Sequence, residues 1–186
     1  MADKDNVYCY TDKRLLYLND DVDNATIGKL IASMLYIISE DDAKDEKEKN
    51  FTREPIKFYI NSFGGSAVDM WSLISIIEQS QTPIHTYCTG YAMSAGFKLF
   101  LAGHKRFMSK RAVLLYHQLA AGNKGKYQDM LERQEHLEHQ QKMVEDFLLS
   151  KTKITQKKLT EIRERKIDWY IYADQAIELG CADEII

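Results

Sequence analysis

Short apolar runs alternate with helical patterns through the first two thirds of this 186-residue chain, and that alternation limits the possible folds more than any other feature. The runs 14–18, 56–60, 84–88 and 112–116 have the length and the bounding turn residues of buried strands, and 107–108 is a shorter candidate. Strands that alternate with helices are typical of an α/β domain with a mainly parallel sheet. Sites in such domains collect at the carboxyl ends of the strands.

Helical patterns separate these runs. Asp23 or Asn24 can cap a first helix whose apolar residues share one face, because they recur at spacings of three and four. These residues are Ile27, Leu30, Ile31, Met34, Leu35 and Ile38. Residues 67–79 are apolar on most sides, which predicts a buried helix, and a short helix is expected to end near 102–103. Two more helices are predicted over 159–165 and 173–179, with Gly180 at a helix C-cap.

Length and composition predict one ordered domain over residues 1–186, since a chain of 21.6 kDa buries about 70% of its surface on folding. With 25 Lys and Arg against 28 Asp and Glu, the net charge of −3 argues against a nucleic-acid partner. We find neither a membrane-spanning run nor a signal peptide, so no membrane partner and a cytoplasmic location are expected. The 3 cysteines form no Cys-x-x-Cys pair, which predicts neither a disulfide framework nor a metal site.

Three segments stand apart from this pattern. Residues 1–13 are largely polar and predict a short amino-terminal segment, and the nearly continuous charges of 40–50 predict a solvated loop or a frayed helix end. Residues 126–152 predict a long helix with a thin apolar stripe. The stripe consists of Met130, Leu137 and Val144. It is too sparse for full burial, so it meets either a partner subunit or the edge of its own domain.

A serine lies at the joint between an expected strand and an expected helix, in the sequence Ala92-Met93-Ser94-Ala95-Gly96. Small neighbours allow a tight turn that pushes the hydroxyl outward, while the next backbone N–H points at a reacting carbonyl. A serine in such a turn can also be an ordinary helix N-cap. The segment therefore predicts a candidate nucleophile, Ser94, with the N–H of Ala95 as a candidate oxyanion donor.

Three other positions could complete a hydrolytic site. His117 directly follows the strand candidate 112–116 and is a candidate base for Ser94, although it could equally be a core histidine. Asp168 lies between two expected helices and could orient the imidazole, or it could be a surface turn residue. The Gly-Gly pair at 64–65 allows positive φ and close backbone approach, so the N–H of Gly65 could face an oxyanion.

The order of these motifs along the chain resembles the proteolytic subunit of the ATP-dependent Clp protease, ClpP. The matching segments are Asn-Ser-Phe-Gly-Gly at 61–65, Gly-Tyr-Ala-Met-Ser-Ala-Gly at 90–96, Tyr-His-Gln at 116–118, Asp168, and 175–183 near the end. The resemblance covers about residues 14–185. It implies a ClpP/crotonase-type α/β single domain in which residues 126–152 form a protruding handle helix.

The resemblance also implies a serine endopeptidase that needs no cofactor and no metal. Its nucleophile would be Ser94, its base His117 and its orienting carboxylate Asp168, with the N–H groups of Gly65 and Ala95 as the oxyanion hole. Subunits would form stacked heptameric rings, a tetradecamer that degrades unfolded polypeptides supplied by a hexameric AAA+ unfoldase. ATP would be used only by that partner, because the chain has no Gly-x-x-x-x-Gly-Lys-Ser/Thr loop. With only residues 1–13 before the first strand, a wider or less ordered ring entrance is expected.

Three other functions stay open on sequence grounds. A phage-type head maturation protease would use the same chemistry on another substrate. A catalytically silent ring subunit would keep the fold for assembly, and the intact Ser94, His117 and Asp168 argue against it. A coenzyme A enzyme of the crotonase kind would share the fold and the oxyanion glycines, but it would leave the Ser/His/Asp set unexplained.

Overall fold

The structure is a computed structural model that describes residues 6–120, 122 and 125–186. In these residues the strands are β1 (Val7–Tyr10), β2 (Leu15–Leu18), β3 (Ile56–Ser62), β4 (Ile84–Met93), β5 (Lys105–Met108), β6 (Val113–Tyr116), β7 (Trp169–Tyr172) and β8 (Glu184–Ile185). The helices are α1 (Asn24–Asp45), α2 (Ala67–Gln79), α3 (Ala95–Ala102), α4 (Tyr127–Lys151), α5 (Gln156–Arg165), α6 (Ala173–Glu178) and a 3₁₀ turn, Thr11–Lys13. The first five residues of the predicted segment 1–13 lie outside the described residues.

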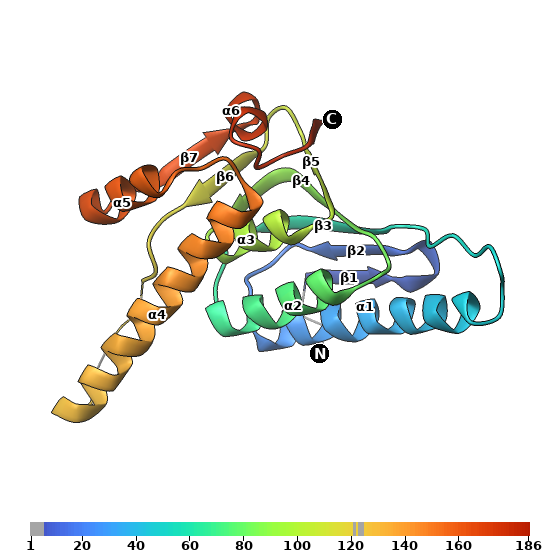
Figure 1. Ribbon diagram of the computed structural model, residues 1–186, viewed down its shortest axis with the longest axis horizontal. Helices are drawn as coiled ribbons and strands as arrows, with labels where there is room; N and C mark the ends of the chain where they lie inside the picture. The colour runs from blue at the N-terminus through green and yellow to red at the C-terminus, as the bar shows by residue number, and fades with distance from the viewer. Residues whose placement is uncertain (1–5, 121, 123–124) are drawn as a thin grey trace.

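All the described strands join one sheet, whose main path runs β1-β2-β3-β4-β5-β8 (Figure 1). Strands β2 to β5 and β8 pair in parallel, and only the β1–β2 and β6–β7 pairs of the described chain are antiparallel. The predicted α/β class with mainly parallel strands is therefore confirmed.

Strand β4 positions the site because it pairs with two strands in succession. Its residues 85–88 pair with β5, and residues 91–93 pair in parallel with β6. Ser94 directly follows β4, and His117 directly follows β6. Since the carboxyl ends of parallel neighbours meet at one edge of a sheet, the topology brings these two residues to the same edge.

One face of the sheet is covered by helices, and the core lies between the two layers. Alternate residues of β2, β3 and β4 point into this core, as the period of a strand requires; they include Leu16, Leu18, Phe58, Ile60, Ile84 and Cys88, all fully buried. Helix α1 begins at the predicted cap, Asp23, whose carboxylate accepts a hydrogen bond from the N–H of Thr26 in a capping box. In Figure 1, α1 and α2 lie beneath strands β1 to β3.

A buried ion pair ties α1 to the start of the sheet. Asp41 is 1% exposed and accepts two hydrogen bonds from the Arg14 guanidinium, at 2.9 and 2.7 Å. Thr82 donates a third at 2.8 Å. Arg14 was expected inside the first strand, but it has φ 52° and ends the 3₁₀ turn before β2, where its side chain reaches Asp41. The charged segment 40–50 therefore begins as helix, since α1 continues to Asp45.

Strands β1, β7 and β8 were missed by the sequence analysis. Strand β1 lies within the largely polar segment 1–13, for which no strand was predicted, and it forms an antiparallel edge with β2. Strand β7 pairs antiparallel with β6 and β8 pairs with β5, so the last third of the chain is not purely helical. Strand β8 has two residues, and β1 (Val-Tyr-Cys-Tyr) and β7 (Trp-Tyr-Ile-Tyr) lack the leucine-rich run by which the equally short β2 and β6 were recognised.

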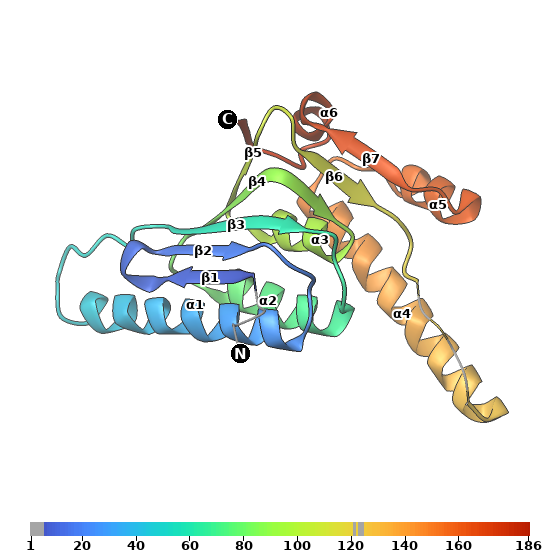
Figure 2. The same cartoon turned by 180° about the vertical axis from the view of Figure 1, so that it is seen from behind.

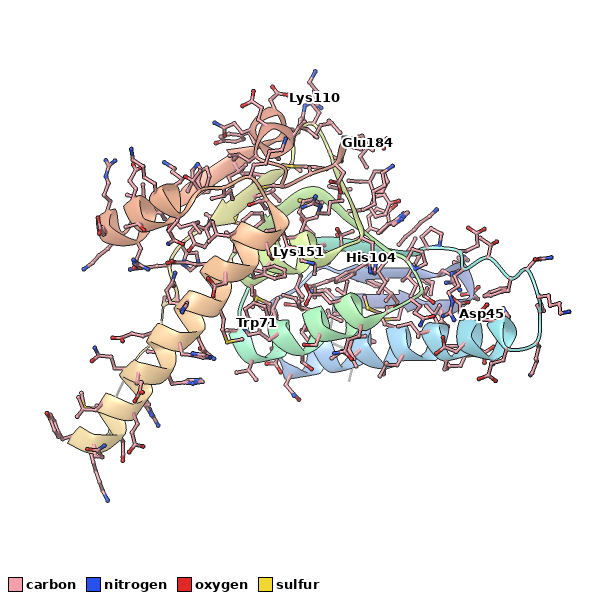
Figure 3. The ribbon with its side chains drawn as sticks, in the orientation of Figure 1. Asp45, Trp71, His104, Lys110, Lys151 and Glu184 are labelled. Carbon is pink, nitrogen blue, oxygen red and sulfur yellow. The ribbon has the colours of Figure 1, made fainter. Side chains whose placement is uncertain are left out.

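Helix α4 projects from the body of the molecule in both ribbon views (Figures 1 and 2). Its last turns pack against α2. The ring of Trp71 meets the ring of Phe147 edge-on, with 5.4 Å between the ring centroids, and Lys151 forms a 2.8 Å ion pair with Glu78 (Figure 3). The predicted stripe divides accordingly. Val144 is buried in the domain's own core, whereas Met130 is 41% exposed. Of the two alternatives, Val144 follows the second, because it packs on its own domain and is not available to a partner subunit.

From the sequence, no membrane-spanning helix and no disulfide framework are expected. Within the described residues, no helix has the length and apolar content needed to cross a bilayer. The cysteines are free thiols: Cys88 and Cys181 are buried, while Cys9 on β1 is half-buried.

Candidate active site

Ser94 has a backbone conformation that an ordinary helix cap does not need. Its φ of 51° and ψ of −118° lie where L-residues are strained, and such strain persists only where the surroundings enforce it. The Ser94 N–H donates to the carbonyl of Leu115 on β6 at 3.0 Å, which fixes the turn. Although Ser94 is the N-cap of α3, its side chain makes no capping hydrogen bond in the described structure. The hydroxyl is thus presented by a strained strand-to-helix turn, the geometry of a nucleophile elbow.

The Gly-Gly turn after β3 packs directly against this elbow. Gly64 has φ 107°, and a Cβ there would lie 2.7 Å from the Cβ of Ser94 and 2.9 Å from the N atom of Ala95. A parallel bridge joins Gly65 to Val22 through the carbonyl of Gly64 and the N–H of Ser66. Because Gly65 does not use its own N–H in that bridge, the N–H points to the other side of the strand. Glycine is required here by contact as well as by conformation.

His117 is half-buried and lies on the same cavity as Ser94. Its Nδ1 is 2.6 Å from the carbonyl oxygen of Gln118. Because a carbonyl can only accept, Nδ1 carries the proton and donates to it, which leaves the Nε2 lone pair available as a base. The backbone therefore selects the tautomer that a general base for Ser94 requires.

Asp168 is placed opposite His117 by strand register. Trp169 pairs with Tyr116 across the antiparallel β6–β7 ladder, and Asp168 precedes Trp169 as His117 follows Tyr116. The residue is exposed. In this structure the nearest partner of Nδ1 is the Gln118 carbonyl rather than a carboxylate, so a hydrogen bond from His117 to Asp168 stays a prediction.

Ser94 and His117 line one cavity of about 380 Å³, together with Gly65. Its other walls come from the start of α2, from α3, from the segment after β6 and from α4; they are Ser66, Ala67, Lys98, Gln118, Leu119, Ala120, Leu137 and Gln140. A second cavity of about 520 Å³ shares Gln118, Leu119 and Leu137 with the first and continues along α4. Because the two cavities share these walls, the hollow beside Ser94 and His117 extends along α4.

Two residues of this region were missed by the sequence analysis. Gln141 was noted only as an interruption of the apolar stripe, yet its side chain accepts from the N–H of Leu119 at 2.9 Å and donates to the Tyr116 hydroxyl at 3.2 Å. It thereby holds the strand that carries His117 against α4. Lys98 is 2% exposed and lines the cavity. A single lysine in the otherwise apolar helix Ala-Gly-Phe-Lys-Leu-Phe-Leu-Ala was a signal that could have identified it.

The family model described as Clp protease matches residues 3–186. A relative named "ATP-dependent Clp protease proteolytic subunit 1", from Prochlorococcus marinus (strain MIT 9312), is 27% identical over 176 residues, which cover 94% of this chain and 84% of that protein. A match along nearly the whole chain, over a fold of the expected class, shows that this chain belongs to the Clp protease family.

Proposed function

We propose that the chain is a serine endopeptidase in which Ser94 is the nucleophile and His117 the general base. The observation that carries the proposal is the strained turn at Ser94. The Ser94 side chain makes no capping hydrogen bond and lines a cavity that it shares with His117. Membership of the Clp protease family supports proteolysis over coenzyme A chemistry on the same fold.

The reaction follows from the positions of these groups. The Oγ of Ser94 attacks the peptide carbonyl carbon while Nε2 of His117 takes its proton, and the oxyanion accepts from the N–H groups of Gly65 and Ala95. The imidazolium then protonates the leaving amine as the C–N bond breaks, which leaves an ester on Ser94. Water, deprotonated by the same Nε2, hydrolyses that ester and restores the hydroxyl. Asp168 would stabilise the imidazolium after Nδ1 turns from the Gln118 carbonyl to the carboxylate.

Helix α4 supports assembly into a compartment. The first turns of the helix expose large apolar side chains to solvent, Tyr127 at 78%, Met130 at 41% and Leu131 at 43%. Exposed apolar groups on a projecting helix favour contact with a second subunit. We infer that this part of α4 is the handle that joins two stacked rings, proposed to be heptamers that form a tetradecamer.

A row of aromatic side chains on the sheet face away from the core supports binding of a protein partner there. Tyr8, Tyr17, Tyr59, Tyr87 and Phe107 occupy successive register positions across five strands. They lie on the sheet face away from the core, where Tyr59 stacks on Tyr87 at 4.6 Å and Tyr87 on Phe107 at 4.7 Å. A cavity of about 570 Å³ opens beside the row. Aromatic surfaces of this kind favour protein contacts, so we propose this face as the docking surface of a hexameric AAA+ unfoldase.

A fluorophosphonate probe tests the proposal, because it reacts only with an activated serine. Wild-type protein should be labelled on Ser94, and Ser94→Ala should lose both the label and peptide hydrolysis, by roughly 10⁴-fold or more. Ser72→Ala, at an exposed position of α2, is the matched control and should keep both. Full peptide hydrolysis by a purified Ser94→Ala protein would exclude serine catalysis, and absence of labelling in the wild type would favour a silent ring subunit.

A further inference from the structure

Lys98 is a buried cation that the proposed mechanism does not use. It lies on α3, one helical turn after Ser94, and is 2% exposed. Its Nζ lies 5.1 Å from the ring centroid of Tyr116, a cation–π distance. Among the described residues Lys98 forms no ion pair with a carboxylate, and burial alone lowers its pKa to about 7.

A lysine in this position is costly unless something compensates its charge. Removing an ammonium from water without a paired carboxylate is unfavourable, and the other residues of α3 are apolar and buried. Glu145, a buried carboxylate whose charge acts on Tyr116, already binds Arg163 at 2.7 Å. A substrate that enters the cavity is therefore the remaining source of an anion for Lys98.

Lys98 forms part of the wall of the cavity that a substrate side chain would enter. Side chains on a helix lean towards its amino terminus, so Lys98 leans towards the turn that carries Ser94. Ser94, Gly65, His117 and Lys98 all line the same cavity. When the carbonyl of a scissile bond lies at Ser94, the side chain of the residue that supplies that carbonyl enters the space beside it. An acidic side chain there can meet the Lys98 ammonium.

We propose that Lys98 is a specificity residue that makes this protease cleave after acidic residues, glutamate above all. The inference rests on the proposed serine protease function. A carboxylate would pair with the ammonium in a setting shielded from water, where charge pairs contribute more than on the surface. The neutral isostere glutamine would leave the cation unpaired, and leucine would leave it unpaired as well.

Three acetyl-capped tripeptide amides that differ only in the residue before the fluorogenic group, Glu, Gln or Leu, test this on the assembled protein. Wild type should show kcat/KM for Glu at least about tenfold above Gln, since a buried charge pair is worth more than the 1.4 kcal/mol that corresponds to tenfold. Lys98→Met should lower kcat/KM for Glu by a similar factor and raise it for Leu. Lys110→Met removes a lysine at an exposed position far from α3 and should leave all three values unchanged (Figure 3).

Fluorophosphonate labelling separates this inference from its foundation, because the probe has no acidic side chain. Lys98→Met should be labelled on Ser94 at the wild-type rate while its Glu selectivity is lost. Loss of labelling in a folded, assembled Lys98→Met protein would show that Lys98 supports the reactivity of Ser94, and would overturn a role confined to specificity. A wild type that is labelled but prefers Leu or Gln to Glu also overturns it. A wild type that is not labelled removes the proposed function and this inference together.

The pH dependence of selectivity gives a second readout. The ratio of kcat/KM for Glu over Gln should fall towards 1 as the pH rises well above 7, because Lys98 loses its proton. Of the groups around it, His117 affects both substrates equally and cancels in the ratio, and burial raises the pKa of Tyr116, which keeps that phenol neutral. Glu145 and Arg163, the other charged groups near Tyr116, form an ion pair with each other at 2.7 Å. A ratio that does not change with pH would contradict the pairing.

Discussion

Replacement of Gly64 by alanine tests whether the active-site turn is held in place by backbone contact. A Cβ at Gly64 would lie 2.7 Å from the Cβ of Ser94, 2.8 Å from the carbonyl O of Met93 and 2.9 Å from the N atom of Ala95. Two of these atoms are backbone and the third belongs to a fixed turn, so no flexible side chain can move away. The φ of 107° adds roughly 1–3 kcal/mol of strain for a residue other than glycine.

The expected result is a loss of both stability and reactivity. Strain and overpacking together should lower the free energy of unfolding by about 2 kcal/mol or more. Displacement of Ser94 by a fraction of an ångström to about 1 Å should slow fluorophosphonate labelling on the order of 10²-fold. Urea unfolding and the time course of labelling measure the two effects separately.

Gly28→Ala provides the matched control. Gly28 is an exposed position within α1, and a Cβ there meets no atom within 4 Å. Alanine should therefore stabilise the helix by about 1 kcal/mol and leave labelling unchanged. If Gly64→Ala were labelled within threefold of the wild-type rate, the reasoning that the Gly-Gly turn holds Ser94 in place would be refuted.

Three other predictions follow from contacts in the fold and the site. Asp41→Asn should destabilise the protein by about 3 kcal/mol, since it leaves a part-buried Arg14 without its charge partner. Burial raises the pKa of Asp41, but the hydrogen bonds from Arg14 and Thr82 outweigh this effect and hold the pKa below its ordinary value. In the wild type, urea titrations should therefore show this part of the stability being lost as the pH falls below about 4. Leu131→Asp should leave the subunit folded but reduce the assembly mass by light scattering, and an unchanged mass would place the ring contact elsewhere. Asp168→Asn should lower kcat by orders of magnitude with little change in KM, and a normal kcat would show that the Gln118 carbonyl alone orients the base.

Much of the architecture could be predicted because its signals are local. The spacing of Ile27 to Ile38 follows from the helical period, and the start of α1 at Asp23 follows from capping chemistry. The bounds of α2 agree with the predicted 67–79. Val68, which belongs to this helix that was expected to be buried, is 68% exposed, because a helix that covers one face of a sheet buries only one of its own sides.

The candidate site was predictable in its members but not in its contacts. Ser94 and His117 could be paired from sequence because each directly follows a strand of a parallel sheet. The register between β6 and β7 places Asp168. That register depends on pairing between segments more than fifty residues apart, and the sequence of β7 does not predict a strand. Lys98 was missed because a lysine on a short helix is usually a surface residue, although the otherwise apolar sequence of α3 indicated a helix that is buried on every side.

The three thiols of the chain have a consequence for labelling chemistry. Burial raises the pKa of Cys88 and of Cys181 to about 12, so neither forms the thiolate that maleimides attack. Cys9 is half-buried and is the most accessible of the three, and its side chain points to the core side of β1, because it pairs with the buried Leu16 while Tyr8 and Tyr10 point to the opposite face. One environment-sensitive dye attached to the unmodified chain would therefore lie on the core side of the edge strand β1, where its emission would report the opening of that edge and not the arrival of a partner on the aromatic face.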